Sequence, residues 1–168
     1  MEEGVILHTK RLTLRRLRES DFNHLLDHIN DRDVANNIIN IPFPFSMFNA
    51  VMRLSYINAG YQEGTRFIFA MISKEHEQLV GEISLHTKEP GQAECSYWLG
   101  KPFRNIGLTT EAIKAICSFG FSEVAYESIF ASCKSSNLAS IRVLEKAGFR
   151  FVKAAGSVHY YSLEKQSK

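Results

Sequence analysis

The spacing of apolar residues changes near residue 65, and this change restricts the folds that are open to the chain. Before it, apolar residues recur at helical intervals, as in Phe22, Leu25 and Ile29 on one face of a helix. After it, residues 67–72 and 79–85 form two apolar-rich runs of strand length, joined by a short turn. We therefore expect helices in the first third of the chain and a hairpin-based sheet at its centre.

The remaining elements follow from the same patterns and from cap residues. Ser20 is the expected N-cap of the first helix, and Gly60 is the expected end of the second. The predicted order is strand, two helices, three strands, helix, strand, helix and one or two final strands. The ranges are 11–15, 22–29, 47–60, 67–72, 79–85, 93–99, 110–121, 128–133, 137–146, and a last strand region at 152 and 158–163. This order predicts a mixed α/β (α+β) fold, with a central sheet of about six or seven strands flanked by helices.

Length and charge bound the domain organisation and the kinds of partner. The chain has 168 residues without repeats or a linker, which predicts one domain over residues 1–168 with a folded core at about 9–164. The net charge is only +2, which argues against nucleic acid and anionic membranes as partners. Apolar runs are too short to span a membrane, and the first residues lack the charge order of a secretory signal. A basic cluster is interpreted as a solvated strand edge: Lys10, Arg11, Arg15, Arg16 and Arg18.

Cysteine and histidine positions bear on the compartment and on metal binding. Cys95, Cys117 and Cys133 are widely spaced in apolar stretches, so we expect reduced thiols in a cytoplasmic protein. His24 and His28 are four residues apart in a predicted helix, as in zinc peptidases, but no third ligand is evident. We interpret them as surface histidines and expect no metal site.

Residues 96–112 carry the strongest chemical signal, because a strand ends there, a short loop follows and a helix begins. The first N–H groups of a helix lack intrahelical acceptors and lie at its positive end, so they attract anions such as a pyrophosphate. Gly107 allows the backbone to approach a ligand closely, and Arg104 offers several donors to phosphate oxygens. Taken alone, these residues are also compatible with an ordinary strand–loop–helix connection.

A second such segment covers residues 135–149, where Asn137 is placed to cap a helix and Ser140 lies in its first turn. Together, the two segments resemble the pyrophosphate loop (Arg/Gln-x-x-Gly-x-Gly/Ala) and the Asn-x-x-Ser/Ala helix of the Gcn5-related N-acetyltransferase superfamily. Several shorter segments are similar to its branch of ribosomal-protein N-terminal acetyltransferases, and the resemblance covers nearly the whole chain: 9–15, 97–99, 110–112 and 137–146.

The resemblance implies an N-acetyltransferase fold whose sheet opens between two strands to hold acetyl-CoA. The main chain of Tyr97, Trp98 and Leu99 would pair with the pantetheine arm, to which Asn137 would also bond. Ser140 would lie near the thioester sulfur. The implied pyrophosphate contacts are Arg104 and the backbone of Asn105, Ile106, Gly107, Leu108, Thr109 and Thr110. The implied reaction is direct acetyl transfer to a primary amine, on a protein N-terminus or a small molecule, and a homodimer is compatible with the resemblance.

Three positions depart from the family pattern. Asn105 and Thr109 stand where the loop often has smaller residues, which predicts looser or shifted cofactor binding. Leu144 stands seven residues after Asn137, where many members carry a tyrosine that protonates the leaving thiolate. Ser140 is therefore our candidate to donate a hydrogen bond to the sulfur, with an ordered water as the alternative.

The acceptor amine must lose a proton during transfer, which makes a base useful. At neutral pH, deprotonation costs about 4–5 kcal/mol for a lysine side chain and about 1 kcal/mol for an α-amine. Glu94 begins the cofactor strand at a position that faces the acceptor in some relatives, so it is the first candidate, and Glu82 on the preceding strand is the second. Each is also compatible with a solvated polar residue of an alternating strand. Two other functions stay open: a non-catalytic acyl-CoA-binding sensor or scaffold, and a domain that binds a different phosphate ligand.

Overall fold

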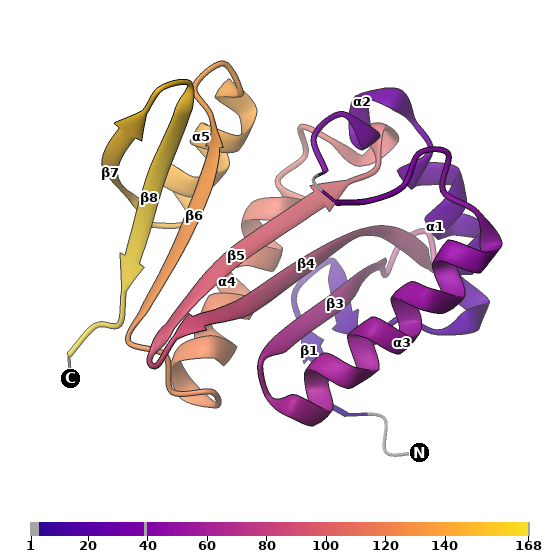
Figure 1. The fold of residues 1–168 in the computed structure, drawn as a ribbon, viewed down its shortest axis with the longest axis horizontal. Helices are drawn as coiled ribbons and strands as arrows, with labels where there is room; N and C mark the ends of the chain where they lie inside the picture. Colours follow the sequence, from indigo (N-terminus) through magenta and orange to yellow (C-terminus); the bar gives the residue numbers. More distant parts are fainter. Residues whose placement is uncertain (1–3, 39, 168) are drawn as a thin grey trace.

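A single eight-stranded sheet, in the order β1-β2-β3-β4-β5-β6-β8-β7, forms the centre of the protein (Figure 1). This computed structural model describes residues 4–38 and 40–167; residues 1–3, 39 and 168 of the predicted domain lie outside the described part. The strands are β1 (Leu7–His8), β2 (Leu12–Arg15), β3 (Arg66–Ser73), β4 (Gln78–Glu89), β5 (Gln92–Leu99), β6 (Ser128–Lys134), β7 (Arg150–Ala155) and β8 (Val158–Glu164). The helices are α1 (Phe22–Ile29), α2 (Arg32–Ala35), α3 (Met47–Glu63), α4 (Leu108–Ser122) and α5 (Leu138–Lys146), with short 3-10 turns at Glu19–Asp21 and Lys101–Phe103.

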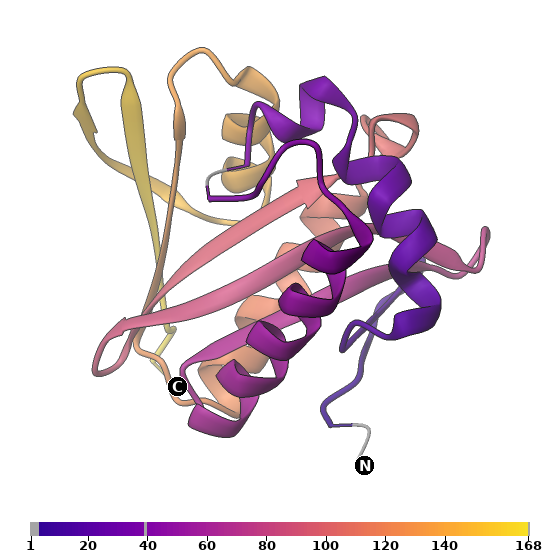
Figure 2. The same cartoon turned by 45° about the vertical axis from the view of Figure 1, so that its right-hand side comes forward.

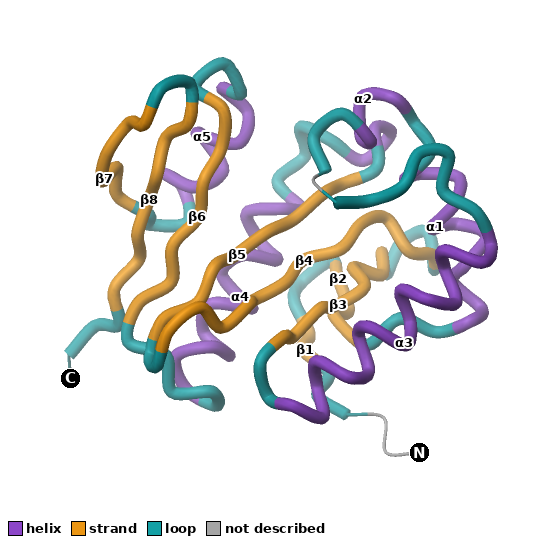
Figure 3. Tube along the Cα trace, in the orientation of Figure 1, coloured by secondary structure: helices purple, strands orange, loops and turns teal. Residues whose placement is uncertain are grey.

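The junction of β5 with β6 differs from the other junctions of the sheet. All other neighbouring strands pair antiparallel, whereas β5 and β6 run parallel and pair at three positions, of which the last joins Glu94 to Phe130. Beyond that pair the two strands diverge, with α5, β6, β7 and β8 on one side and the remaining strands on the other (Figures 1 and 3). The carboxyl half of β5 therefore presents a free backbone edge toward the divergence.

Helices cover both faces of the sheet. On one face, α1 and α3 contribute Phe22 and Ile57 to a buried core. On the other, α4 and α5 contribute Ile113 and Leu144 to a second core. Figure 2 shows α3 in front of the sheet and α4 behind it. No helix within residues 4–38 or 40–167 is long and apolar enough to cross a membrane.

The helices and strands expected from the sequence are present, and most of their ends shift by only a few residues. The structure adds two short elements that the sequence patterns did not predict, β1 and α2. The sheet has eight strands and not six or seven, because β1 pairs with β2 at one edge and β7 pairs with β8 at the other.

Two predicted helix ends are wrong. Ser20 lies inside a 3-10 turn, and α1 begins only after Asp21. Helix α3 continues through Gly60 and ends at Gly64, whose φ of 69° suits a left-handed C-cap. A Cβ atom on Gly60 would lie 2.6 Å from the Cβ of Arg66, so this glycine allows close packing and does not end the helix.

Candidate functional site

The carboxyl half of β5 is held on one side only. Tyr97, Trp98 and Leu99 pair with β4, whereas in the described residues the pairing with β6 ends at Glu94. Because side chains alternate along a strand, Trp98 packs into the core under α3 while Tyr97 and Leu99 pack on the α4 side. The unpaired N–H and C=O groups along this edge can bond an extended ligand as a further strand would.

The loop after β5 leads directly into the N-terminus of α4. Gly107 is the N-cap residue, with a φ of 85°, and Asn105 also has a left-handed φ of 66°. Leu108 begins the helix, so the N–H groups of its first turn point out of the end of the helix without intrahelical acceptors. Arg104 folds back and donates from Nε to the Leu99 carbonyl at 3.4 Å. Backbone donors and a guanidinium thus meet at the open end of β5, an arrangement suited to a phosphate group.

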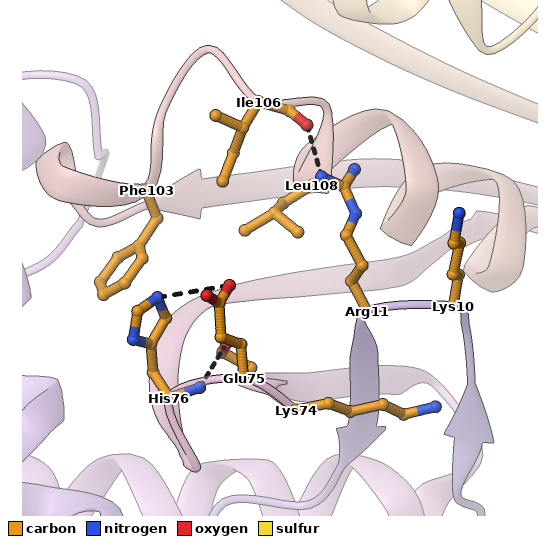
Figure 4. Close-up of a pocket in the computed structure, with 9 residues that line it drawn as sticks. Lys10, Arg11, Lys74, Glu75, His76, Phe103, Ile106 and Leu108 are labelled. Carbon is orange, nitrogen blue, oxygen red and sulfur yellow. Dashed lines mark hydrogen bonds and ion pairs between the residues drawn. The ribbon is translucent and has the colours of Figure 1, made fainter.

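Arg11 directly precedes β2, and its side chain reaches this loop. Figure 4 shows its guanidinium beside Ile106 and Leu108. Its Nη1 donates to the Ile106 carbonyl at 2.7 Å, and its Nε lies 3.6 Å from a Glu111 carboxylate oxygen in the first turn of α4. A Cβ atom on Gly107 would be 3.2 Å from Nη2 of Arg11. Arg11 therefore fixes the carbonyl that precedes the N-cap and brings positive charge to the helix end.

The interpretation of the basic cluster as a solvated strand edge is wrong for Arg15 and Arg16. Arg15 forms a two-pronged ion pair with the buried Asp21, at 2.8 and 3.0 Å, and the half-buried Arg16 lies over the Tyr61 ring, 4.1 Å from its centroid. Arg11 stays exposed but bonds the loop. Lys10, Arg11 and Lys74 also border a pocket of about 210 Å³ next to the loop (Figure 4). Lys74 was missed because it lies far from Lys10 and Arg11 in the sequence and comes next to them only through the pairing of β2 with β3.

The N-terminus of α5 faces the free edge of β5 across the divergence. Asn137 caps α5, and its Oδ1 accepts a hydrogen bond from the Ser140 backbone N–H at 3.1 Å, which confirms the predicted cap. The Ser140 hydroxyl lies 2.6 Å from the Tyr97 hydroxyl. Burial raises the pKa of Tyr97, so its phenol keeps its proton at neutral pH.

A row of polar side chains lies on the α3 face of β4 and β5. The register pairs them across the two strands as Glu82 with Trp98, Ser84 with Ser96, and His86 with Glu94. Glu94 stands at the last β5–β6 pair, where the strands begin to diverge, and its carboxylate is 3.0 Å from the Lys88 ammonium. The Glu94 side chain is 28% exposed, so solvent or an acceptor can reach it.

Glu82 has a different environment from Glu94. It is 2% exposed, and both of its oxygens accept hydrogen bonds from the Arg53 guanidinium of α3. Trp98 donates to the same carboxylate from Nε1 at 3.1 Å. Glu82 is therefore engaged in a buried ion pair, whereas Glu94 is the more accessible of the two candidate bases.

His86 is a residue of this face that the sequence patterns did not single out. Its Nε2 is 3.1 Å from the Ser84 hydroxyl, and burial lowers its pKa with a further contribution from Lys88. The available signal was the run Glu82, Ser84 and His86, which places polar residues at every second position of an otherwise apolar strand. Such a run marks a strand face that does not pack entirely into a core.

Comparison with known proteins agrees with this geometry. Residues 11–150 match the acetyltransferase (GNAT) domain family. The chain belongs to the GNAT acetyltransferase family. An uncharacterized N-acetyltransferase of Bacillus licheniformis is 29% identical over 146 residues, which cover 86% of this chain and 82% of that protein.

Solved structures show the same fold. The ribosomal-protein-S5-alanine acetyltransferase of Vibrio fischeri superimposes with a TM-score of 0.83 at 18% identity, covering 96% of this chain and 97% of the other. RimL, a ribosomal-protein α-N-acetyltransferase solved in complex with coenzyme A, gives a TM-score of 0.82 at 18% identity, with 95% and 98% covered. The expected mixed α/β GNAT fold is thereby confirmed, and the chain is an acetyltransferase.

The GNAT chain accommodates its departures from the family pattern locally. Asn105 adopts a left-handed φ, which asparagine tolerates better than most residues. Thr109 is only 9% exposed, so the protein interior takes up most of its side chain. Leu144 is fully buried in the core on the α4 side and provides no hydroxyl.

The histidine pair of α1 takes no part in this site. His28 packs edge-on against Phe103, with ring centroids 5.2 Å apart, and is not a purely surface residue as interpreted from the sequence. Across the described parts of the GNAT chain, no group of three or more His, Cys, Asp or Glu residues is arranged to hold a metal ion.

Proposed function

We propose that the protein transfers the acetyl group of acetyl-CoA directly to a primary amine, on a protein N-terminus or on a small molecule. One observation carries the proposal: the free edge of β5 runs from Glu94, where the strands diverge, to the N-terminus of α4. The five residue steps from Glu94 to Leu99 span about 17 Å of extended strand. An extended arm bonded to this edge would place its phosphate end at the loop and its thioester end beside Glu94.

The residues around this path divide into contacts for different parts of acetyl-CoA. The main chain of Tyr97, Trp98 and Leu99 would pair with the amide groups of the pantetheine arm. Asn137 uses Oδ1 for its own helix, so its side-chain NH₂ group remains available to a carbonyl of the arm. The pyrophosphate would be held by Arg104 and by the backbone of Asn105, Ile106, Gly107, Leu108, Thr109 and Thr110.

The chemical step requires one base and one hydrogen-bond donor. The amine nitrogen forms a bond to the acetyl carbonyl carbon, the C–S bond breaks, and the sulfur leaves as a thiolate. Glu94 accepts the proton that the amine nitrogen loses, and Lys88 neutralises the carboxylate before the reaction. Ser140 donates a hydrogen bond to the departing sulfur from the opposite side of the divergence. Glu82 is the less suited base, because Arg53 and Trp98 already occupy its oxygens.

The alternative function is an acyl-CoA-binding sensor or scaffold without catalysis, which the leucine at position 144 favours. The Ser140 hydroxyl favours catalysis instead, since it offers a donor where the family's usual tyrosine is missing. Calorimetric titration with acetyl-CoA, followed by an amine panel read through free thiol release, separates the two. We expect binding and transfer; binding without transfer to any amine would support the sensor, and no binding would exclude both functions.

Glu94→Gln is expected to lower kcat for acetyl transfer by about 100-fold or more, since a positioned base contributes at least this much. The affinity for CoA, measured by calorimetry, should stay within about two-fold, because the glutamine keeps the shape of the side chain. Glu89→Gln provides the control, because it removes the same charge from an exposed position on the neighbouring strand, β4. Equal losses in the two variants would contradict the role of Glu94.

Arg11→Gln is expected to weaken CoA binding by about ten-fold, because it removes a charged hydrogen bond that holds the loop. The change should appear in the calorimetric Kd and in the KM for acetyl-CoA, while the KM for the amine stays constant. Lys10→Gln is the matched control, since Lys10 borders the same pocket and carries the same charge. An equal loss in both variants would indicate general surface attraction and not a specific contact of Arg11.

A further inference from the structure

The hydroxyl pair of Tyr97 and Ser140 joins the two sides of the strand divergence. Tyr97 comes from the free half of β5, and Ser140 comes from the first turn of α5, 43 residues later in the chain. The two oxygens are 2.6 Å apart, a short distance for a hydrogen bond between neutral hydroxyl groups. The backbone of Ser140 is fixed as well, because its N–H donates a hydrogen bond to Oδ1 of Asn137.

Either oxygen can donate at this distance, and the acidity of the two groups favours Tyr97 as the donor. A phenol is a far stronger acid than an aliphatic alcohol, and therefore the better donor. Burial raises the pKa of Tyr97, so the phenol keeps its proton and has it to donate. With the Tyr97 proton directed to the Ser140 oxygen, the serine keeps its own proton for a second partner.

The neighbourhood restricts what that second partner is. Cys133 of β6 also lies near Ser140: burial raises the pKa of its thiol, and the Ser140 hydroxyl acts in the opposite direction. A thiol sulfur is a weak acceptor. A developing thiolate in the divergence would attract the serine proton much more strongly, because hydrogen bonds to charged groups are roughly twice as strong as neutral ones.

We propose that Tyr97 is a positioning residue, which holds the Ser140 hydroxyl with its proton directed at the sulfur that leaves in acetyl transfer. This inference rests on the proposed function and extends it to a residue whose side chain that function does not use. Tyr97 itself transfers no proton. It donates one hydrogen bond to Ser140 throughout the reaction and thereby polarises the serine hydroxyl, which is the next member of the chain of hydrogen bonds. It explains how a GNAT chain with Leu144 in its helix can still stabilise the leaving group, since the missing hydroxyl is supplied from β5 through Ser140.

Tyr97→Phe tests the proposal, because it deletes one oxygen and keeps the ring in its packing. We expect kcat for acetyl transfer to fall roughly ten-fold, with the calorimetric Kd for CoA within about two-fold, as for loss of one hydrogen bond that acts on the departing group. Tyr126→Phe is the matched control: Tyr126 is another buried tyrosine, between α4 and β6, whose hydroxyl bonds Thr87 of β4. It should leave kcat unchanged.

The double variant makes the test independent of folding effects. Ser140→Ala should lower kcat at least as much as Tyr97→Phe, and adding Tyr97→Phe to Ser140→Ala should cause no further loss, because Tyr97 acts through Ser140. Additive losses, a loss in affinity with kcat unchanged, or an equal loss in Tyr126→Phe would each overturn the proposal. If the wild-type protein binds acetyl-CoA but transfers to no amine, the proposed function fails and this inference fails with it; normal transfer by Tyr97→Phe overturns the inference alone.

Discussion

Gly107→Val is expected to weaken CoA binding by about 100-fold, through strain of the order of 1–3 kcal/mol and loss of the aligned loop amides. Gly107 has a φ of 85°, a conformation that a β-branched residue strongly disfavours. A Cβ atom there would also lie 3.2 Å from the Arg11 guanidinium, so the side chain would press against the group that fixes the loop. Calorimetric titration with CoA measures the effect directly.

The control for Gly107→Val is a glycine with the same backbone requirement but no ligand role. Gly64 ends α3 with a φ of 69°, and a Cβ atom on it would meet nothing within 4 Å. Gly64→Val should therefore lower the thermal midpoint of unfolding about as much as Gly107→Val does. It should leave the affinity for CoA unchanged. Wild-type affinity in Gly107→Val would contradict the placement of the pyrophosphate at this loop.

Arg53→Met is expected to lower the free energy of unfolding by about 3–5 kcal/mol, because it leaves the Glu82 carboxylate buried without its counter-charge. Burial works against the charge of Arg53, but the Glu82 carboxylate more than offsets this, and the pKa of Arg53 is raised. The ion pair joins α3 to the centre of the sheet, with Trp98 as a third member. Urea denaturation followed by circular dichroism measures the loss.

A double variant and a control variant test whether the loss of stability comes from the buried ion pair. Replacing both partners, as Arg53→Met with Glu82→Leu, should recover most of the loss, since no uncompensated charge remains. Lys88→Met should cost less than about 1 kcal/mol, because the Lys88–Glu94 pair is partly solvated. Additive losses for the Arg53 and Glu82 substitutions would show that the pair is not the source of the effect.

Local sequence patterns predicted most of the elements correctly, and particular residues show why. Asn137 caps α5 as expected, and Gly148 follows its end with a left-handed φ of 94°. Both depend only on residues within one or two turns of the same helix. Gly60 shows where such signals mislead. Its lack of a side chain makes room for Arg66 on the neighbouring strand and does not mark the end of its own helix.

In the candidate site too, local sequence patterns predicted some features, and others depend on tertiary packing. The strand–loop–helix at residues 96–112 was evident because a strand end, a glycine and a helix start are neighbours in the chain. The different environments of Glu82 and Glu94 were not evident, because both residues occupy polar positions of alternating strands. Only the packing of α3 on the sheet separates them, by bringing Arg53 to Glu82 and leaving Glu94 beside Lys88 at the divergence.

The amino-acid sequence by itself determined the order of the elements, the strand–loop–helix at Gly107 and the capped helix at Asn137, because these depend on backbone preferences over a few residues. The tertiary structure decided the contacts of Tyr97 with Ser140, Arg53 with Glu82 and Arg11 with Ile106, which are 43, 29 and 95 residues apart. Such contacts depend on strand order and register, and a register change of one residue would turn Tyr97 to the opposite face of the sheet.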